Sequence, residues 1–116
     1  MHKRITFRNM ATSTVMEEYA SKQLKKIEDF LAEEKTPIYI DLVFEPSKVH
    51  EHHRVELRVK TPNYDRISNY EHEGMPFYEV VDRVIDVMYY ELHEDKKRMV
   101  EDRKMVGRHE EFKKQR

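Results

Sequence analysis

The sequence from Tyr70 to Leu92, YEHEGMPFYEVVDRVIDVMYYEL, decides the fold of this chain. It opens with an acidic, glycine-containing turn, EHEGM, at positions 71–75. The apolar residues that follow recur with the spacing of one helical face, at positions 77, 80, 81, 84, 85, 88 and 92. This spacing predicts an amphipathic helix packed on a core, and Pro76 suits its first turn. We expect the helix to end at Val106, because a glycine such as Gly107 is a common helix terminator.

Four segments outside this helix alternate apolar and polar residues, which is the pattern of half-buried strands. They lie at 4–8, 38–44, 54–60 and, with a weaker pattern, 64–70. Another helix is predicted between the first two strands, where Thr14 and Glu17 form a capping box. Its apolar stripe consists of Met16, Ala20, Leu24, Ile27 and Leu31. The order β-α-β-β-β-α predicts an α+β fold, a four-stranded sheet with two helices on one face.

The same alternation assigns side chains to the two faces of the sheet. We predict that the core depends on Leu24, Ile27, Leu42, Leu57, Ile85 and Met88. The other sheet face is predicted to carry Arg4, Arg8, Arg54, Glu56, Arg58 and Lys60. An error of one residue in the register of a strand would exchange its buried and exposed side chains.

The length and composition indicate one domain. The chain has 116 residues, of which 38% are hydrophobic and 39% charged, so it can bury one modest core under a strongly charged surface. We predict a single domain over residues 1–106 and a polar C-terminal tail over residues 107–116. The net charge is only −1, but residues 1–93 hold 13 Lys and Arg against 17 Asp and Glu, whereas residues 94–116 hold 9 against 6. This concentration of positive charge near the C-terminus favours contact with a polyanion.

The sequence lacks the signals of an exported, membrane-spanning or catalytic protein. It has no cysteine, no apolar segment of signal-peptide type at its N-terminus, and no apolar run near the ~20 residues of a membrane span. With two glycines it has no Gly-rich phosphate loop, and no serine lies in a nucleophile elbow. We therefore expect a cytoplasmic protein that is not an enzyme. We expect it to have neither a cofactor nor a membrane partner.

Two motifs resemble those of a known family. The turn EHEGM (71–75) precedes the helix segment YEVVDRVID (78–86), and the first helix contains EEYASKQLKKIE (17–28). With the element order, they resemble the short ribosome hibernation-promoting factors, also called the ribosome-associated inhibitor or protein Y family, over residues 3–104. The resemblance implies a fold like a double-stranded-RNA-binding domain. It also implies binding in the mRNA and tRNA channel of the small ribosomal subunit, against its ribosomal RNA, which keeps idle ribosomes inactive under stress.

The resemblance assigns the RNA contacts to basic positions on the two helices. Residues 22, 25 and 26 match the basic face of the first helix, and residues 96–98 match the lysine-rich end of the second. At 100° per residue, positions 96, 97, 103 and 104 share one quadrant of the second helix. The predicted RNA-binding residues are Lys22, Lys25, Lys26, Arg83, Tyr90, Lys96, Lys97, Arg98, Arg103 and Lys104.

The chain departs from the pattern of the family at three positions of the second helix. Val87, Tyr90 and Glu94 stand where relatives carry basic residues. Each lost phosphate contact lowers the electrostatic part of the affinity. The departures therefore predict weaker ribosome binding, for which the extension from Met99 onward is a partial replacement.

The residues alone leave alternatives open. The basic end of the second helix also fits a solvated helix balanced by nearby acidic residues. The cluster HEHH (50–53) could place two imidazoles on one strand face, which suits Zn²⁺, Ni²⁺ or Cu²⁺. Because no fourth ligand is evident, we interpret it as a polar loop and assign no metal site. The alternative function is a protein-interaction or metal-responsive module that uses this cluster and Tyr90.

We expect the protein to be a monomer away from the ribosome. Long members of the family that it resembles add a second domain, which dimerises. Residues 107–116 contain only Phe112 as a large apolar residue. The partners that the resemblance implies are the small ribosomal subunit and its rRNA.

Overall fold

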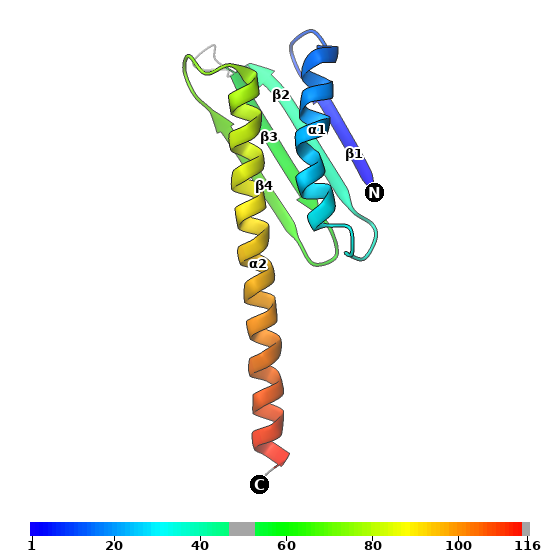
Figure 1. The fold of residues 1–116 in the computed structure, drawn as a ribbon, viewed down its shortest axis with the longest axis vertical. Helices are drawn as coiled ribbons and strands as arrows, with labels where there is room; N and C mark the ends of the chain where they lie inside the picture. Colours follow the sequence, from blue (N-terminus) through cyan, green and yellow to red (C-terminus); the bar gives the residue numbers. More distant parts are fainter. Residues whose placement is uncertain (47–52, 115–116) are drawn as a thin grey trace.

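The computed structural model describes residues 1–46 and 53–114, with side chains as far as residue 103. Its elements follow the predicted order (Figure 1). They are β1 (His2–Phe7), α1 (Thr14–Phe30), β2 (Tyr39–Pro46), β3 (His53–Lys60), β4 (Asp65–Glu71) and α2 (Phe77–Lys114).

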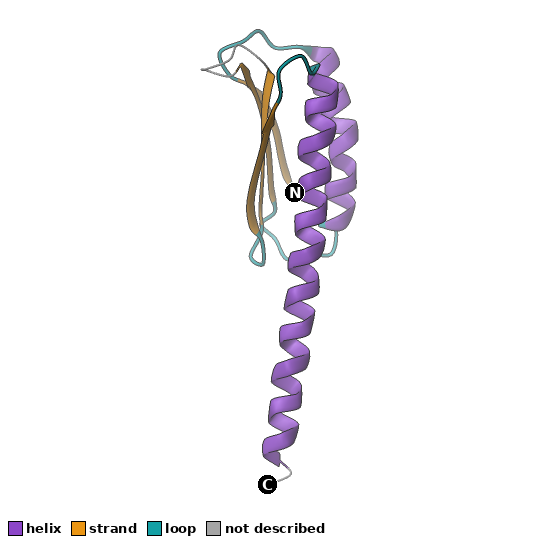
Figure 2. Cartoon of the chain, turned by 90° about the vertical axis from the view of Figure 1, so that its left-hand side faces the viewer, coloured by secondary structure: helices purple, strands orange, loops and turns teal. Residues whose placement is uncertain are grey.

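The four strands form one sheet in the order β1-β2-β3-β4. β1 is parallel to β2, and the other neighbouring pairs are antiparallel. α1 makes the crossover that a parallel β1–β2 pair requires. Both helices lie on one face of the sheet (Figures 1 and 2). The predicted α+β fold is confirmed.

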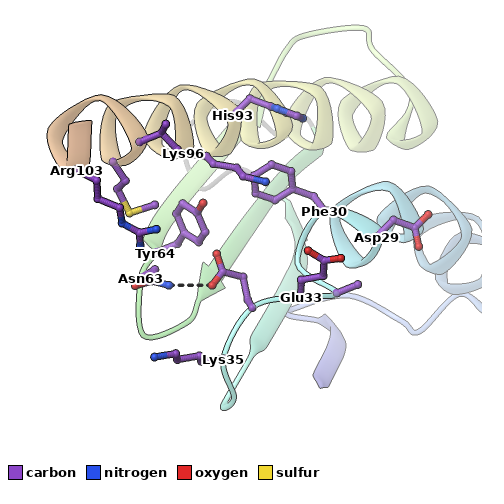
Figure 3. A pocket seen from close by; sticks show the side chains of 13 residues that line it. Asp29, Phe30, Glu33, Lys35, Asn63, Tyr64, His93, Lys96 and Arg103 are labelled. Atoms are coloured by element: carbon purple, nitrogen blue, oxygen red, sulfur yellow. Dashed lines mark hydrogen bonds between the residues drawn. The ribbon is translucent and has the colours of Figure 1, made fainter. Parts of the chain in front are cut away.

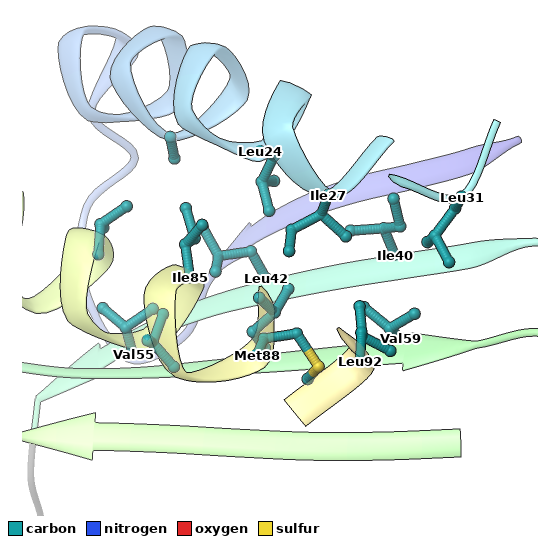
Figure 4. Close-up of a cluster of buried hydrophobic side chains, with 14 of the residues drawn as sticks. Leu24, Ile27, Leu31, Ile40, Leu42, Val55, Val59, Ile85, Met88 and Leu92 are labelled. Atoms are coloured by element: carbon teal, nitrogen blue, oxygen red, sulfur yellow. The ribbon is translucent and has the colours of Figure 1, made fainter. Parts of the chain in front are cut away.

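The strand register places one apolar row under the helices. Ile5 pairs with Leu42, and Leu42 pairs with Leu57. Leu42 and Leu57 are fully buried and belong to one core with residues of both helices. Figure 4 shows Leu42 among the side chains of this core. All six predicted core residues are buried, with exposed fractions of 2% or less. The predicted register is therefore confirmed.

The opposite face of the sheet carries charges that pair across the strands. Arg4 on β1 contacts Asp41 on β2 at 3.1 Å. The carboxylate of Glu45, a residue that is 5% exposed, accepts a hydrogen bond from Arg54 on β3 and lies 3.8 Å from Arg8. A further pair joins β3 and β4, between Arg58 and Asp65 at 3.3 Å. Opposite charges on neighbouring strands therefore offset one another on this face.

The turn before α2 explains the glycine in the acidic motif. Gly74 has a φ of 74°, a left-handed conformation that side chains with a Cβ disfavour. The Met75 N–H donates to the His72 carbonyl at 3.3 Å, which closes the turn. α2 then begins at Phe77, directly after Pro76.

Two predicted helix boundaries are wrong. α1 is capped by Ser13, whose hydroxyl oxygen accepts a hydrogen bond from the Met16 N–H at 3.3 Å, and not by Thr14. Serine and threonine are both favoured N-caps, and the glutamate three residues after Thr14 made the capping-box pattern point to Thr14 instead of its neighbour. α2 continues through Gly107 to Lys114, because an interior glycine costs a helix only about 1 kcal/mol and does not by itself end it. That residues 107–116 form a tail outside the domain stays a prediction.

α2 extends well beyond the sheet. The molecule measures 65 × 27 × 18 Å, and its C-terminal helical turns project past the end of α1 and the strands (Figure 2). Leu92 is the last fully buried residue of α2 in the described part of the chain. None of the described helices combines the length and apolar character needed to cross a bilayer.

Candidate functional site

The seam between the two helices is closed at its N-terminal end by polar and aromatic contacts. The Tyr19 hydroxyl of α1 lies 2.8 and 2.9 Å from the two carboxylate oxygens of Asp82 on α2. Its ring meets Tyr78 edge to face at 4.8 Å. Further along the seam, the Lys26 ammonium donates to Asp86 at 3.0 Å. Burial, with the hydrogen bond to Asp82 as a second cause, raises the pKa of Tyr19 to about 12.

Past the end of α1 the seam opens into a groove. The groove has a volume of about 530 Å³ and lies between the end of α1, the β3–β4 turn and α2 (Figure 3). We name it the end groove. It is lined by Asp29, Phe30, Ala32, Glu33, Glu34, Lys35, Asn63, Tyr64, His93, Lys96, Met99, Val100 and Arg103.

Aromatic rings gather around Phe30 at the head of the end groove. The His93 ring meets it edge to face, with centroids 4.6 Å apart. The ring centroids of Tyr89 and Tyr64 lie 6.1 and 6.0 Å from the centroid of the Phe30 ring. The Lys96 ammonium lies over the Phe30 ring, 5.5 Å from its centroid. The cluster therefore offers ring surface and positive charge in the same place.

The facing wall comes from the β3–β4 turn. The Asn63 side-chain amide donates to Glu34 at 2.9 Å, which ties the turn to the segment after α1. Tyr64 is almost fully buried, and burial, aided by Glu34, raises the pKa of its hydroxyl to about 12 while Arg103 opposes the shift. This hydroxyl is therefore protonated at neutral pH.

Sequence reasoning missed the end groove as a site, although α2 carried a signal for it. Positions 89, 93, 96, 100 and 103 follow one another at intervals of four, three, four and three residues, which is the spacing of a single helical stripe. The last four of them line the groove. No pattern indicated that Phe30 and Tyr64 would meet this stripe, because they reach it only through the tertiary fold.

The predicted cations of α1 do not share one surface. Lys22 and Lys25 lie on the side of α1 that faces β1, where they line a shallow hollow with Lys3. Lys26 faces α2 instead, with its ammonium paired to Asp86 and 4.4 Å from the Tyr89 ring centroid.

The predicted residues of α2 also divide into groups. Lys96 and Arg103 both line the end groove. This agrees with the prediction that they lie on the same side of the helix. Arg83, Lys97 and Arg98 are exposed and make no ion pair with any residue that the structure describes. Tyr90 is 66% exposed, and the side chain of Lys104 lies outside the described part. The ten predicted residues are therefore distributed over both helices and the groove.

The histidine cluster lies mostly outside the described residues. His50 and His52 fall in the segment 47–52, which the structure does not describe. The His53 ring stacks on Phe77, with centroids 3.8 Å apart and an interplanar angle of 24°. Within the described residues, no three His, Asp or Glu side chains are grouped so that they could hold a metal ion.

Comparison with known proteins identifies the family. The family model described as "Sigma 54 modulation protein / S30EA ribosomal protein" matches residues 4–100. The chain belongs to this family. S30EA proteins are ribosome-associated hibernation and interface factors rather than enzymes, so the predicted family and the non-enzymatic character are confirmed. The curated protein sequences contain no match to this chain.

Solved structures share the S30EA fold. The N-terminal domain of Protein Y from Thermus thermophilus has a TM-score of 0.62 at 17% identity, over 78% of this chain and 94% of that one. A ribosomal subunit interface protein from Coxiella burnetii has a TM-score of 0.65 at 21% identity, over 84% of this chain and 99% of that one. At these identities the similarity concerns the fold alone.

Proposed function

We propose that this protein binds the small ribosomal subunit in its mRNA and tRNA channel, holds ribosomal RNA with the basic residues of its two helices, and keeps idle ribosomes inactive by occupancy. Membership of a ribosome-associated family supports the ribosome as partner. The Coxiella burnetii protein that shares the fold is a ribosomal subunit interface protein, which also supports the ribosome as partner.

The observation that carries the proposal is the contrast between paired and unpaired cations. The arginines at positions 4, 8, 54 and 58 on the open sheet face are each paired with a carboxylate, and of the cations predicted for that face Lys60 alone makes no ion pair with a described residue. On the helix side, Lys22, Lys25 and Lys97 make no ion pair with any described residue. An unpaired cation reaches a phosphate without giving up a protein partner, so the helix side supports RNA binding better than the sheet.

The geometry also ranks the predicted cations. Lys26 must leave Asp86 to reach a phosphate, so its replacement is expected to lower affinity less than that of Lys25. A double charge reversal, Lys25→Glu with Lys97→Glu, therefore tests the proposal more sharply than a variant that includes position 26.

The test measures co-sedimentation with purified small subunits at about 100 mM salt. We expect the Lys25→Glu, Lys97→Glu variant to bind at least about tenfold more weakly, because phosphate neutralisation dominates such affinities. Exposed charges contribute little to folding stability, so its thermal unfolding should resemble that of the original protein.

The matched control reverses two cations of the open sheet face, Arg58→Glu with Lys60→Glu, and changes the net charge equally. This variant should still sediment with small subunits. Equal weakening by both variants would show that total charge, and not the helix side, determines binding. Undiminished binding of the helix variant would favour a protein contact, such as one through Tyr90.

Competition tests the position in the channel. We expect a bound mRNA with initiator tRNA to displace the protein from small subunits, and the protein to inhibit translation by purified ribosomes. Simultaneous binding of all three components would contradict the channel assignment.

A further inference from the structure

The end groove has the size and the lining of a ligand site. Its volume of about 530 Å³ falls within the range of roughly 300–1,000 Å³ typical of small-molecule sites. It combines ring surface, three cations (Lys35, Lys96 and Arg103) and carboxylates within a few side-chain lengths (Figure 3). The combination of rings, cations and carboxylates limits the class of ligand that the groove can bind.

The ring surface suits a planar, unsaturated group. Phe30 and His93 stand edge to face at 4.6 Å, and the His93 side chain is exposed. Unpaired bases stack on such side chains. The Lys96 ammonium now lies over the Phe30 ring, so a base that takes this position releases the ammonium toward the phosphate of the same nucleotide.

The cations extend from the ring cluster along α2. Lys96 and Arg103 line the groove on one stripe of the helix, about 10 Å apart along its axis. Arg103 makes no ion pair with a described residue. The cations therefore lie beyond the rings along the groove. A nucleotide has the same arrangement, with its phosphate beyond its base.

The carboxylates select among bases. Glu34 is already held by Asn63, whereas Glu33 is exposed and makes no ion pair or side-chain hydrogen bond with a described residue. A carboxylate accepts two parallel hydrogen bonds. Guanine presents two neighbouring donors on its Watson–Crick edge, its N1–H and its N2 amino group, whereas adenine presents one donor beside an acceptor.

We infer that the end groove binds a guanine nucleotide, with its base on Phe30 and His93, its donor edge on Glu33 and its phosphate on Lys96 and Arg103. As an unpaired guanine of RNA, this ligand rests on the proposed function and names one element that the protein recognises on the ribosome. A free guanine nucleotide has the same chemistry, and the experiment separates the two sources.

The experiment titrates the full chain, without ribosomes, with four probes. Two are single-stranded RNA hexamers of uridine that carry one central guanosine or one central adenosine, and two are GMP and AMP. We expect the guanosine hexamer to bind about tenfold more tightly than the adenosine hexamer, which is the discrimination of one bidentate base contact. GMP that binds as tightly as the guanosine hexamer would identify a free nucleotide as the source, and a hexamer that binds much more tightly would identify RNA.

Variants assign the contacts. Glu33→Gln should remove the preference for guanine while binding to the adenosine hexamer persists. Lys96→Ala should weaken both hexamers alike. Glu18→Gln on the exposed part of α1 is the matched control and should change neither. Thermal unfolding of each variant verifies the fold.

Equal affinity for guanine and adenine probes, or no binding of any probe at millimolar concentration, would overturn the inference. A guanine preference that survives Glu33→Gln would also overturn it. Small-subunit binding measured in parallel separates this outcome from the proposed function. A protein that binds subunits without a guanine preference refutes only the groove, and one that prefers guanine but ignores subunits refutes only the ribosomal role.

Discussion

At the scale of single residues, the raised pKa values of two tyrosines reflect the contacts that close the helix seam and form the wall of the end groove. Burial is the first cause that raises the pKa values of Tyr19 and Tyr64 to about 12, and carboxylates at Asp82 and Glu34 add to it. The unfolded chain releases these protons near pH 10, whereas the folded chain keeps them to about pH 12. Their contribution to stability is therefore complete below pH 10 and is lost as the pH rises to 12.

We expect the free energy of unfolding to fall between pH 10 and 12 and this fall to become smaller in the Tyr19→Phe, Tyr64→Phe variant. Urea unfolding at several pH values measures the first effect, and the absorbance of tyrosinate in the folded protein measures the late titration. Each single variant serves as the control for the other and should remove part of the fall. An unchanged pH dependence in the double variant would show that these hydroxyl groups do not titrate as described.

At the scale of elements, α2 is fastened to the edge strand β4 by one arginine. Arg66 donates to both carboxylate oxygens of Asp95 at 2.7 Å and lies 3.7 Å from Glu91. These hydrogen bonds are the main cause that holds the pKa of Asp95 below its ordinary value. A lowered carboxyl pKa stabilises the fold above the ordinary pKa of aspartate, and this contribution is lost as the pH falls through the folded value.

We expect Asp95→Asn to lower the free energy of unfolding by about 1 kcal/mol at neutral pH, the upper range for a partly exposed ion pair. The difference from the original protein should shrink as the pH falls below about 4, the ordinary pKa of aspartate. A double-mutant cycle with Arg66→Gln, followed by urea unfolding, isolates the pair. Glu91→Gln, which changes the more distant carboxylate, is the milder control. Additive effects of the two single changes would contradict a direct coupling.

At the scale of the whole molecule, local patterns predicted the layers but not the site. Alternation around Leu57 determined which strand face is buried, and the spacing from Val80 to Leu92 determined the packed face of α2, because burial follows these periods directly. The end groove required Phe30, Tyr64 and His93 to meet from three separate segments, and no local period encodes such a meeting. The end of α2 was mispredicted for a related reason, since Gly107 supplies a preference and not a stop signal.

The extent of the folding unit yields the last prediction. α2 continues to Lys114, but every buried core residue in the described part lies at or before Leu92. A chain of residues 1–106 should therefore fold with a thermal midpoint within about 3 °C of the full chain, because it loses no described core contact.

Residues 107–116 hold four Lys or Arg against two Glu, so the shorter chain should bind small subunits more weakly at low salt, with a shallower dependence on salt. A midpoint lowered by much more than this would place the helical extension inside the folding unit and refute the predicted boundary, whereas unchanged affinity at low salt would show that the extension does not approach the RNA.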